Sequence, residues 1–397
     1  MKSEFHKTVL KNGLTILFEK RNLPIVNILY SSRFGSAYES DKLKGVAHLI
    51  EHMVFKGTKN RNQKEIAKEI EGVGGVINAF TAQQQTTFWD QLPSKYYTKG
   101  FEIISDIMTS PLFDKKELEK EKKVVFEEQK RWRDLPEHYI FLKIRGLLYN
   151  NPFGSSPLGT SKTLTEMDSK TILDFHQNNL SRGILTVVGN ANFEEIINNA
   201  EAKLKQTNVK ISLPEIMRKN GSSIENREGL NQTHIALGMH MPSLSQKDRY
   251  AAEIISNILG GGMSSRLWQE IRERRSMAYS VNAAIEQEKD YGHMIIYAGI
   301  ENSKLKDAKE IILKEIKKLQ QLNRKDIEES KEQLIGNFLL HIESGVNVAQ
   351  NLVLNEIAGD AEEFYNYDER ISKVSLEDVK RISDIKDYSF AALVPMT

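Results

Sequence analysis

The stretch KKELEKEKKVVFEEQ, residues 115–129, is charge-rich and long enough for one extended helix, and a similar stretch recurs later in the chain. RKDIEESKEQLIGNF, residues 324–338, aligns with it without gaps, so that Asp326 matches Glu117 across an interval of 326 − 117 = 209 residues. That interval is close to half of the 397 residues. Because similarity at a fixed interval indicates repeated structural units, we predict that the chain is a duplication.

The elements around these two helices follow a similar order in both halves. Alternating apolar residues around Asn12-Gly13 predict an opening hairpin, and both halves place a strand pair before their long helix. We therefore predict an α+β fold of two homologous domains of about 200 residues, each a mostly antiparallel sheet packed with helices. The expected domains are 1–205 and 230–397, and the polar residues 206–229 between them are typical of a linker.

Composition excludes several classes of function. Lys and Arg number 55 and Asp and Glu 54, so the formal charge of +1 argues against nucleic acid or an anionic membrane as the main partner. The absence of cysteine excludes disulfides, thiolate metal sites and a cysteine nucleophile. The N-terminal residues lack a signal-peptide pattern. The chain also has no run of the ~18 apolar residues that a membrane span requires. We expect a cytoplasmic protein, unless a targeting segment has already been removed.

The stretch GVAHLIEHMVFKGT, residues 45–58, carries two histidines, His48 and His52, with Glu51 between them. Residues four apart lie on one face of a helix, so both imidazoles could reach one ion at the ~2.0–2.1 Å typical of zinc. Glu51 could then act on a water molecule at the ion without being a ligand. The alternative is a core helix whose histidines are held by hydrogen bonds. The apolar residues around this H-x-x-E-H spacing favour a metal site.

A third ligand is expected on the first long helix. Leu118, Glu121, Val125, Glu128 and Trp132 follow helical steps of 3, 4, 3 and 4, which predicts a stripe facing the core. Burying an unpaired carboxylate costs several kcal/mol, so a cation should meet the two glutamates. We predict Glu128 as the third ligand and Glu121 as its support. In the alternative, this stripe does not face the core, and neighbouring Lys and Arg side chains pair with its glutamates in solvent.

Three motifs together resemble the M16 metallopeptidases, the pitrilysin or insulinase-like family that includes the mitochondrial processing peptidase and its beta subunit. They are HLIEHMVFKGT, the E-x6-E pair and GGGMSSRLWQEIRERRSMAYSV, and the chain is most similar to the short bacterial members. The interval from His52 to Glu128, 128 − 52 = 76 residues, is the family's spacing. The resemblance implies that His48, His52 and Glu128 bind Zn2+, that Glu51 is the general base and that Glu121 supports the catalytic site.

The resemblance also implies substrate contacts. Asn78 and Ala79 match an edge strand that takes substrate as an added strand, and Arg272 and Tyr279 match a substrate-contacting pair. From the residues alone, Asn78 is typical of an ordinary strand or turn, Arg272 of a solvated helix face and Tyr279 of a core. In the second half, Asn337 replaces Glu128 and the H-x-x-E-H motif is missing, so one zinc ion per chain is expected.

Two functions follow as hypotheses. The first is a zinc-dependent endopeptidase that hydrolyses peptides or presequence-like segments, bound as an extended strand in a closed dimeric chamber. Family members of this length pair two chains, so a homodimer is expected, or a heterodimer with a related chain. The second hypothesis is a non-catalytic assembly or peptide-binding subunit that keeps the fold. The intact motif around Glu51 favours the first.

Overall fold

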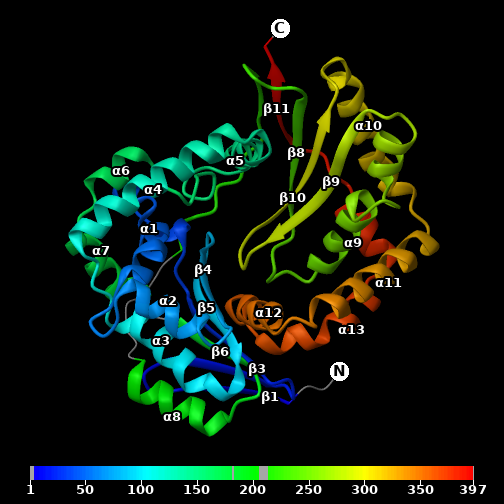
Figure 1. Cartoon of the computed structure of the whole chain (residues 1–397). Coiled ribbons are helices and arrows are strands. Elements are labelled where there is room, and N and C mark those ends of the chain that lie inside the picture. The colour runs from blue at the N-terminus through cyan, green and yellow to red at the C-terminus, as the bar shows by residue number, and fades with distance from the viewer. Residues whose placement is uncertain (1–3, 181–182, 205–212, 397) are drawn as a thin grey trace. The chain divides into compact units, whose positions relative to one another are not determined.

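The computed structural model describes residues 4–180, 183–204 and 213–396, and these form two compact units (Figure 1). Each unit is assembled from three separate segments of chain. Unit 1 comprises the described residues of Met1–Gln129, Ser156–Pro214 and His341–Tyr365, and unit 2 those of Lys130–Ser155, Glu215–Leu340 and Asn366–Thr397. No helix in these described ranges is both long and apolar enough to cross a membrane.

Unit 1 contains a six-stranded sheet in the order β1-β2-β6-β3-β5-β4. The β2–β6 pair is parallel and the other pairs are antiparallel. The strands are β1 (Phe5–Val9), β2 (Thr15–Lys20), β3 (Ile25–Ser32), β4 (Val76–Thr81), β5 (Thr86–Pro93) and β6 (Gly183–Gly189). The helices are α1 (Val46–Met53), α2 (Gln63–Glu71), α3 (Tyr97–Thr109), most of α4 (Lys115–Asp134), α6 (Ser161–Glu166), α7 (Ser169–Phe175), α8 (Phe193–Lys203) and α12 (Gly345–Ala358).

Alternating residues of the central strand β3 face the two sides of this sheet. Val26, Ile28 and Tyr30 join the apolar core that α1 and α3 also line. On the other face, α12 contacts β3 and β6, and Figure 1 draws it in orange beside the blue strands although it comes from late in the chain. Its first residue is Gly345, where a Cβ atom would collide with Asn27 of β3. The close approach of α12 therefore depends on glycine.

Unit 2 repeats this sheet with five strands in the order β7-β11-β8-β10-β9. Only β7–β11 is parallel, and each pair corresponds to one in the series β2-β6-β3-β5-β4. The strands are β7 (Ser222–Arg227), β8 (Thr233–Met241), β9 (Ala278–Gln287), β10 (Gly292–Ile300) and β11 (Ser389–Pro395). The helices are α5 (Pro136–Leu148), α9 (Arg249–Gly260), α10 (Leu305–Lys318), α11 (Arg324–His341), α13 (Tyr367–Ser372) and α14 (Leu376–Ile382). The predicted α+β fold of two similar, mostly antiparallel units is confirmed.

The long helices α4 and α11 begin at Lys115 and Arg324, and this is the interval of 209 residues that the sequence alignment predicts (324 − 115). The predicted linker is not wholly irregular, because its residues Ser222–Arg227 form β7. Its residues 206–212 lie outside the described part of the chain.

Unit 2 in turn contains a helix from the first half of the chain. Ile140 and Ile144 of α5 pack against Ala236 and Leu393 on one face of the sheet. On the opposite face, α9 contacts β9 and shares an apolar core with the alternate residues of β8 and β10. Each half of the sequence therefore supplies one helix to the sheet of the other half.

A substitution at Gly238 on β8 tests whether α5 packs against this sheet. A Cβ at Gly238 would lie 2.8 Å from Leu148 Cδ1 and 2.9 Å from Ile144 Cγ1, both on α5. We expect Gly238→Ala to lower the free energy of unfolding by about 1–2 kcal/mol, because a full core resists added atoms. Gly336 in the middle of α11 has nothing within 4 Å of the same position, so Gly336→Ala should add about 0.5–1 kcal/mol. Denaturant titrations compare the two, and a neutral Gly238→Ala would contradict the packing.

Candidate metal centre

The helix α1 presents both histidines of the H-x-x-E-H motif to the same region of unit 1. The ring centroids of His48 and His52 lie 4.7 Å apart. The apolar residues of α1 are buried in the core, which determines the face that the histidines occupy. His48 is itself buried, and His52 is half-buried.

The helix α4 brings a carboxylate to both imidazoles. Glu128 Oε2 lies 3.6 Å from His48 Nε2 and 3.6 Å from His52 Nε2. One ligand atom from each of the three residues can be chosen so that all lie within 4.8 Å of one another, and no other such group occurs among the described residues. Tetrahedral zinc with bonds of ~2.0–2.1 Å separates its ligand atoms by ~3.3 Å. The three side chains therefore fit a zinc ion with only small shifts.

The two ring nitrogens of His48 have different surroundings. Its Nδ1 is buried and has no hydrogen-bond partner within the described ranges. Burial, with a smaller contribution from the charge of His52, lowers the pKa of His48 to about 3. The imidazole is therefore neutral at pH 7 and has a lone pair available for an ion. The nitrogen that faces Glu128 is Nε2, so this atom is the one that would bind the ion.

His52 is oriented by Glu121, as the stripe on α4 predicts. Its Nδ1–H donates to Glu121 Oε2 at 3.1 Å, which leaves Nε2 directed at Glu128. Metal-binding histidines commonly donate their second N–H to a carboxylate in this way. Burial lowers the pKa of His52, but the bond to Glu121 and the surrounding carboxylates outweigh it and raise the pKa.

Lys56 is a further member of this cluster, and the motifs of the sequence do not include it. Its Nζ lies 2.5 Å from Glu121 Oε1. Burial raises the pKa of Glu121, but its bonds to His52 and Lys56 lower the pKa by a larger amount. The net shift is downward, and the group is a carboxylate. The available signal was the spacing, because Lys56 follows His52 by four residues, one helical turn.

Glu51 is held by a residue of the neighbouring edge strand. Thr81 Oγ1, at the end of β4, donates to Glu51 Oε2 at 2.6 Å. Burial raises the pKa of Glu51, and the bond from Thr81 opposes this, with a net shift upward. The sequence pattern does not single out Thr81, although this residue stands in the INAFT stretch. In that stretch, Asn78 and Ala79 lie on β4 at the edge of the sheet, and Asn78 is exposed.

Arg272 and Tyr279 lie together in unit 2. The Arg272 guanidinium carbon is 5.3 Å from the centroid of the Tyr279 ring and 4.0 Å from that of Trp268. Tyr279 is 83% exposed, so the reading of this residue as a core tyrosine is wrong. Trp268 was not predicted, but it precedes Arg272 by one helical turn and its Nε1–H donates to Glu273 at 3.0 Å. Both rings lie within cation–π distance of the guanidinium, which favours this position of Arg272.

In unit 2, amide groups take the place of the histidine–carboxylate contacts. Asn257 of α9 donates through Nδ2 to Ser330 Oγ at 2.9 Å and to Gln333 Oε1 at 3.0 Å, both on α11. Ser330 follows Glu121 at the repeat interval, 330 − 121 = 209. The described residues of unit 2 contain no metal-binding group of the kind found in unit 1. The described part of the chain therefore offers one candidate metal centre.

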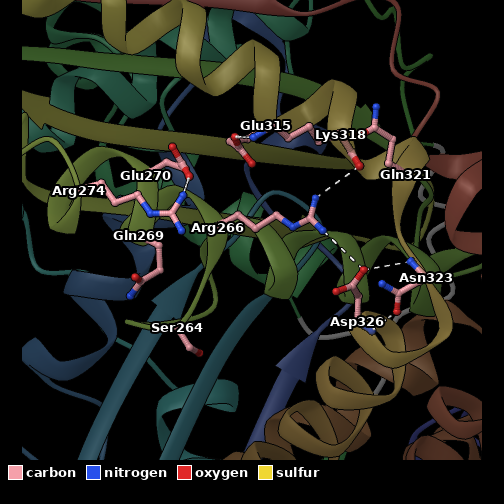
Figure 2. A pocket seen from close by; sticks show the side chains of 10 residues that line it. All are labelled: Ser264, Arg266, Gln269, Glu270, Arg274, Glu315, Lys318, Gln321, Asn323 and Asp326. Atoms are coloured by element: carbon pink, nitrogen blue, oxygen red, sulfur yellow. Dashed lines mark hydrogen bonds and ion pairs between the residues drawn. The ribbon is translucent and has the colours of Figure 1, made fainter.

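A polar pocket in unit 2 is a weaker candidate for a functional site. Figure 2 shows its side chains, and its volume is about 490 Å³. Its charged groups are satisfied by one another: Arg266 lies 3.7 Å from Asp326 and Lys318 bonds to Glu315 at 2.6 Å. Such pairing leaves little electrostatic attraction for a ligand.

These features define a class of protein, namely a duplicated α+β chain in which, among the described residues, the first unit alone carries a His-His-Glu centre. A family described as Insulinase (Peptidase family M16) matches residues 19–161, and the Peptidase M16 inactive domain matches residues 166–334. The chain belongs to peptidase family M16. The second match agrees with the absence of a metal-binding group from the described residues of unit 2.

Individual relatives cover most of the chain. An uncharacterized zinc protease of Rickettsia felis is 34% identical over 86% of this chain and 84% of its own length. Another from Bacillus subtilis is 28% identical over 97% of both chains. The crystal structure of a protease from Helicobacter pylori has a TM-score of 0.92 over 100% of both chains at 24% identity, which supports the fold.

The centre predicts one zinc ion per chain. We expect metal analysis of dialysed protein to find one equivalent, and Glu128→Gln to lose it. Glu121→Gln should weaken binding by about 10–100-fold, because outer partners tune ligand geometry. The exposed neighbour Glu127 is the matched control, and Glu127→Gln should bind zinc normally. Loss of zinc from both the Glu127 and Glu128 variants would contradict the assignment.

Proposed function

We propose that this protein is a zinc-dependent endopeptidase that hydrolyses peptides or presequence-like segments held in extended form. The observation that carries the proposal is the convergence of His48, His52 and Glu128 beside Glu51. An edge strand adjoins the same site through Thr81. The names of the relatives from Rickettsia felis and Bacillus subtilis, both zinc proteases, support the choice of metal and of reaction class.

The residues of the chain divide the chemistry between them. His48, His52 and Glu128 would hold zinc, which supplies polarisation of the scissile carbonyl and a lowered pKa for the attacking water. Glu51 takes the proton from that water and returns it to the leaving amine. Thr81 keeps the carboxylate of Glu51 in one orientation, since a hydrogen bond to an ionised group is short and directional.

The edge strand β4 suits the binding of an extended peptide. A peptide added at Asn78 and Ala79 would bond to the main chain, which gives affinity with little dependence on sequence. Binding of this kind would let one site accept peptides of many sequences. Arg272 and Tyr279 would donate to a substrate carbonyl or to the developing oxyanion.

The general base provides the direct test of this function. We expect Glu51→Gln to lower the cleavage of a mixed peptide library by about 10²–10⁴-fold, the usual contribution of general acid–base catalysis. The variant should still bind one equivalent of zinc, and a chelator should abolish cleavage by the wild type. Glu127→Gln serves as the control. Zinc binding without hydrolysis of any peptide by the wild type would favour the non-catalytic, peptide-binding alternative.

We also propose that two chains form a closed chamber, so that the metal centre of one chain meets Arg272 and Tyr279 of its partner. A homodimer is the simplest form, and a related chain could replace one copy. Mixing inactive His52→Ala chains with inactive Tyr279→Phe chains should restore part of the activity, because one of the two sites then has all its parts. A mixture that stays inactive while subunits exchange would refute the arrangement, as would an active monomer.

A further inference from the structure

The N-terminus of α1 is held by a side chain from outside the helix. Glu39, only 4% exposed, accepts from Gly45 N–H through Oε2 and from Ala47 N–H through Oε1, both at 2.8 Å. The first amide groups of a helix have no partner within it and favour a negative charge. Gly45, at φ +90°, has no side chain to cap the helix itself. One carboxyl group therefore binds two amides of the helix start, those of Gly45 and Ala47.

This anchor matters because α1 is short. It has eight residues, and isolated helices below about 12–15 residues are marginal in water. Its position and rotation therefore depend on contacts with the rest of unit 1. Ala47 directly precedes His48, so a shift of the helix at Ala47 moves His48, and with it His52, relative to Glu128 on α4. Apolar packing is not directional, whereas the two hydrogen bonds to Glu39 are.

A second contact ties the same helix start to the third ligand. Thr163 Oγ1 donates to the carbonyl of Lys44 at 2.7 Å, and a Cβ at Gly45 would lie 2.8 Å from the Cα of Gly159. Gln129 Nε2 donates to the carbonyls of Leu158 at 2.9 Å and Gly159 at 3.3 Å. Gln129 directly follows Glu128 on α4. The loop at 158–159 therefore packs against the start of α1 and bonds to the neighbour of Glu128.

We propose that Glu39 is a positioning residue of the metal centre, acting through α1 to set where His48 and His52 meet Glu128. The inference rests on the proposed zinc-dependent function, and it adds a residue 9 positions before the first ligand (48 − 39) that touches neither metal nor substrate. Burial raises the pKa of Glu39 to about 8, although its two amide bonds and Lys44 oppose the rise. A buried carboxyl group is a costly way to cap a helix, which favours a role in geometry as well as stability.

The test measures zinc affinity on metal-stripped protein, by competition with a chromogenic chelator and without any peptide. Glu39→Gln keeps the size of the side chain but offers only one acceptor, and Glu39→Ala offers none. We expect the Kd for zinc to rise about 10–100-fold in both. Co²⁺ bound in place of zinc should show a changed visible spectrum in Glu39→Gln, because that spectrum depends on ligand geometry.

Glu19 is the matched control, a buried carboxylate on β2 of the same unit that accepts from Arg21 Nε at 2.7 Å. Glu19→Gln should lower the thermal midpoint and leave the zinc Kd and the Co²⁺ spectrum unchanged. The positioning role is overturned if the Glu39 variants bind zinc as the wild type does, or if Glu19→Gln weakens binding equally. A wild-type chain that binds no zinc would instead overturn the proposed function and the basis of this inference with it.

Discussion

The contact between α1 and α4 is the constraint on which this structure depends. Both helices bury apolar residues in the core of unit 1, yet the faces that they turn to each other carry two histidines and two glutamates. Buried polar atoms are costly unless they have partners. Glu121 satisfies Nδ1 of His52, and a cation between the two Nε2 atoms and Glu128 would satisfy those two nitrogens. The chemistry of the site is thus a consequence of how the core is closed.

The two duplicated units share some buried contacts and differ in others. The buried Lys122 on α4 bonds to Glu119 at 2.8 Å and to a carbonyl at residue 165. Its repeat, Lys331 on α11, bonds to Glu328 at 2.8 Å and to a carbonyl at residue 372. These structural contacts persist in both units. The metal-binding side chains do not, and in unit 2 the amide of Asn257 links α9 to α11 instead.

Each of the two sheets is covered in part by a helix from the other half of the chain. Helix α5 packs on the sheet of unit 2 and α12 on that of unit 1, so neither sheet is covered by its own half of the sequence alone. Glycines allow both approaches, Gly238 beneath α5 and Gly345 at the start of α12. Each unit therefore requires residues from both halves of the chain, and this favours folding of the two halves together.

The sequence by itself determined the features that have a local period. The four-residue spacing of His48 and His52, the stripe on α4 with its two glutamates, and the repeat at 209 residues all follow from helical geometry and self-similarity. Only the tertiary structure decided the parts that depend on contacts between distant segments. Glu39 and Thr81 reach α1 from a loop and a strand with no periodic signal, and α5 and α12 show no preference in sequence for the other half's sheet. Tyr279 is likewise exposed because of its place on the strand β9, which pattern alone does not reveal. Periodicity reports which face of an element is buried, whereas packing decides what that face meets.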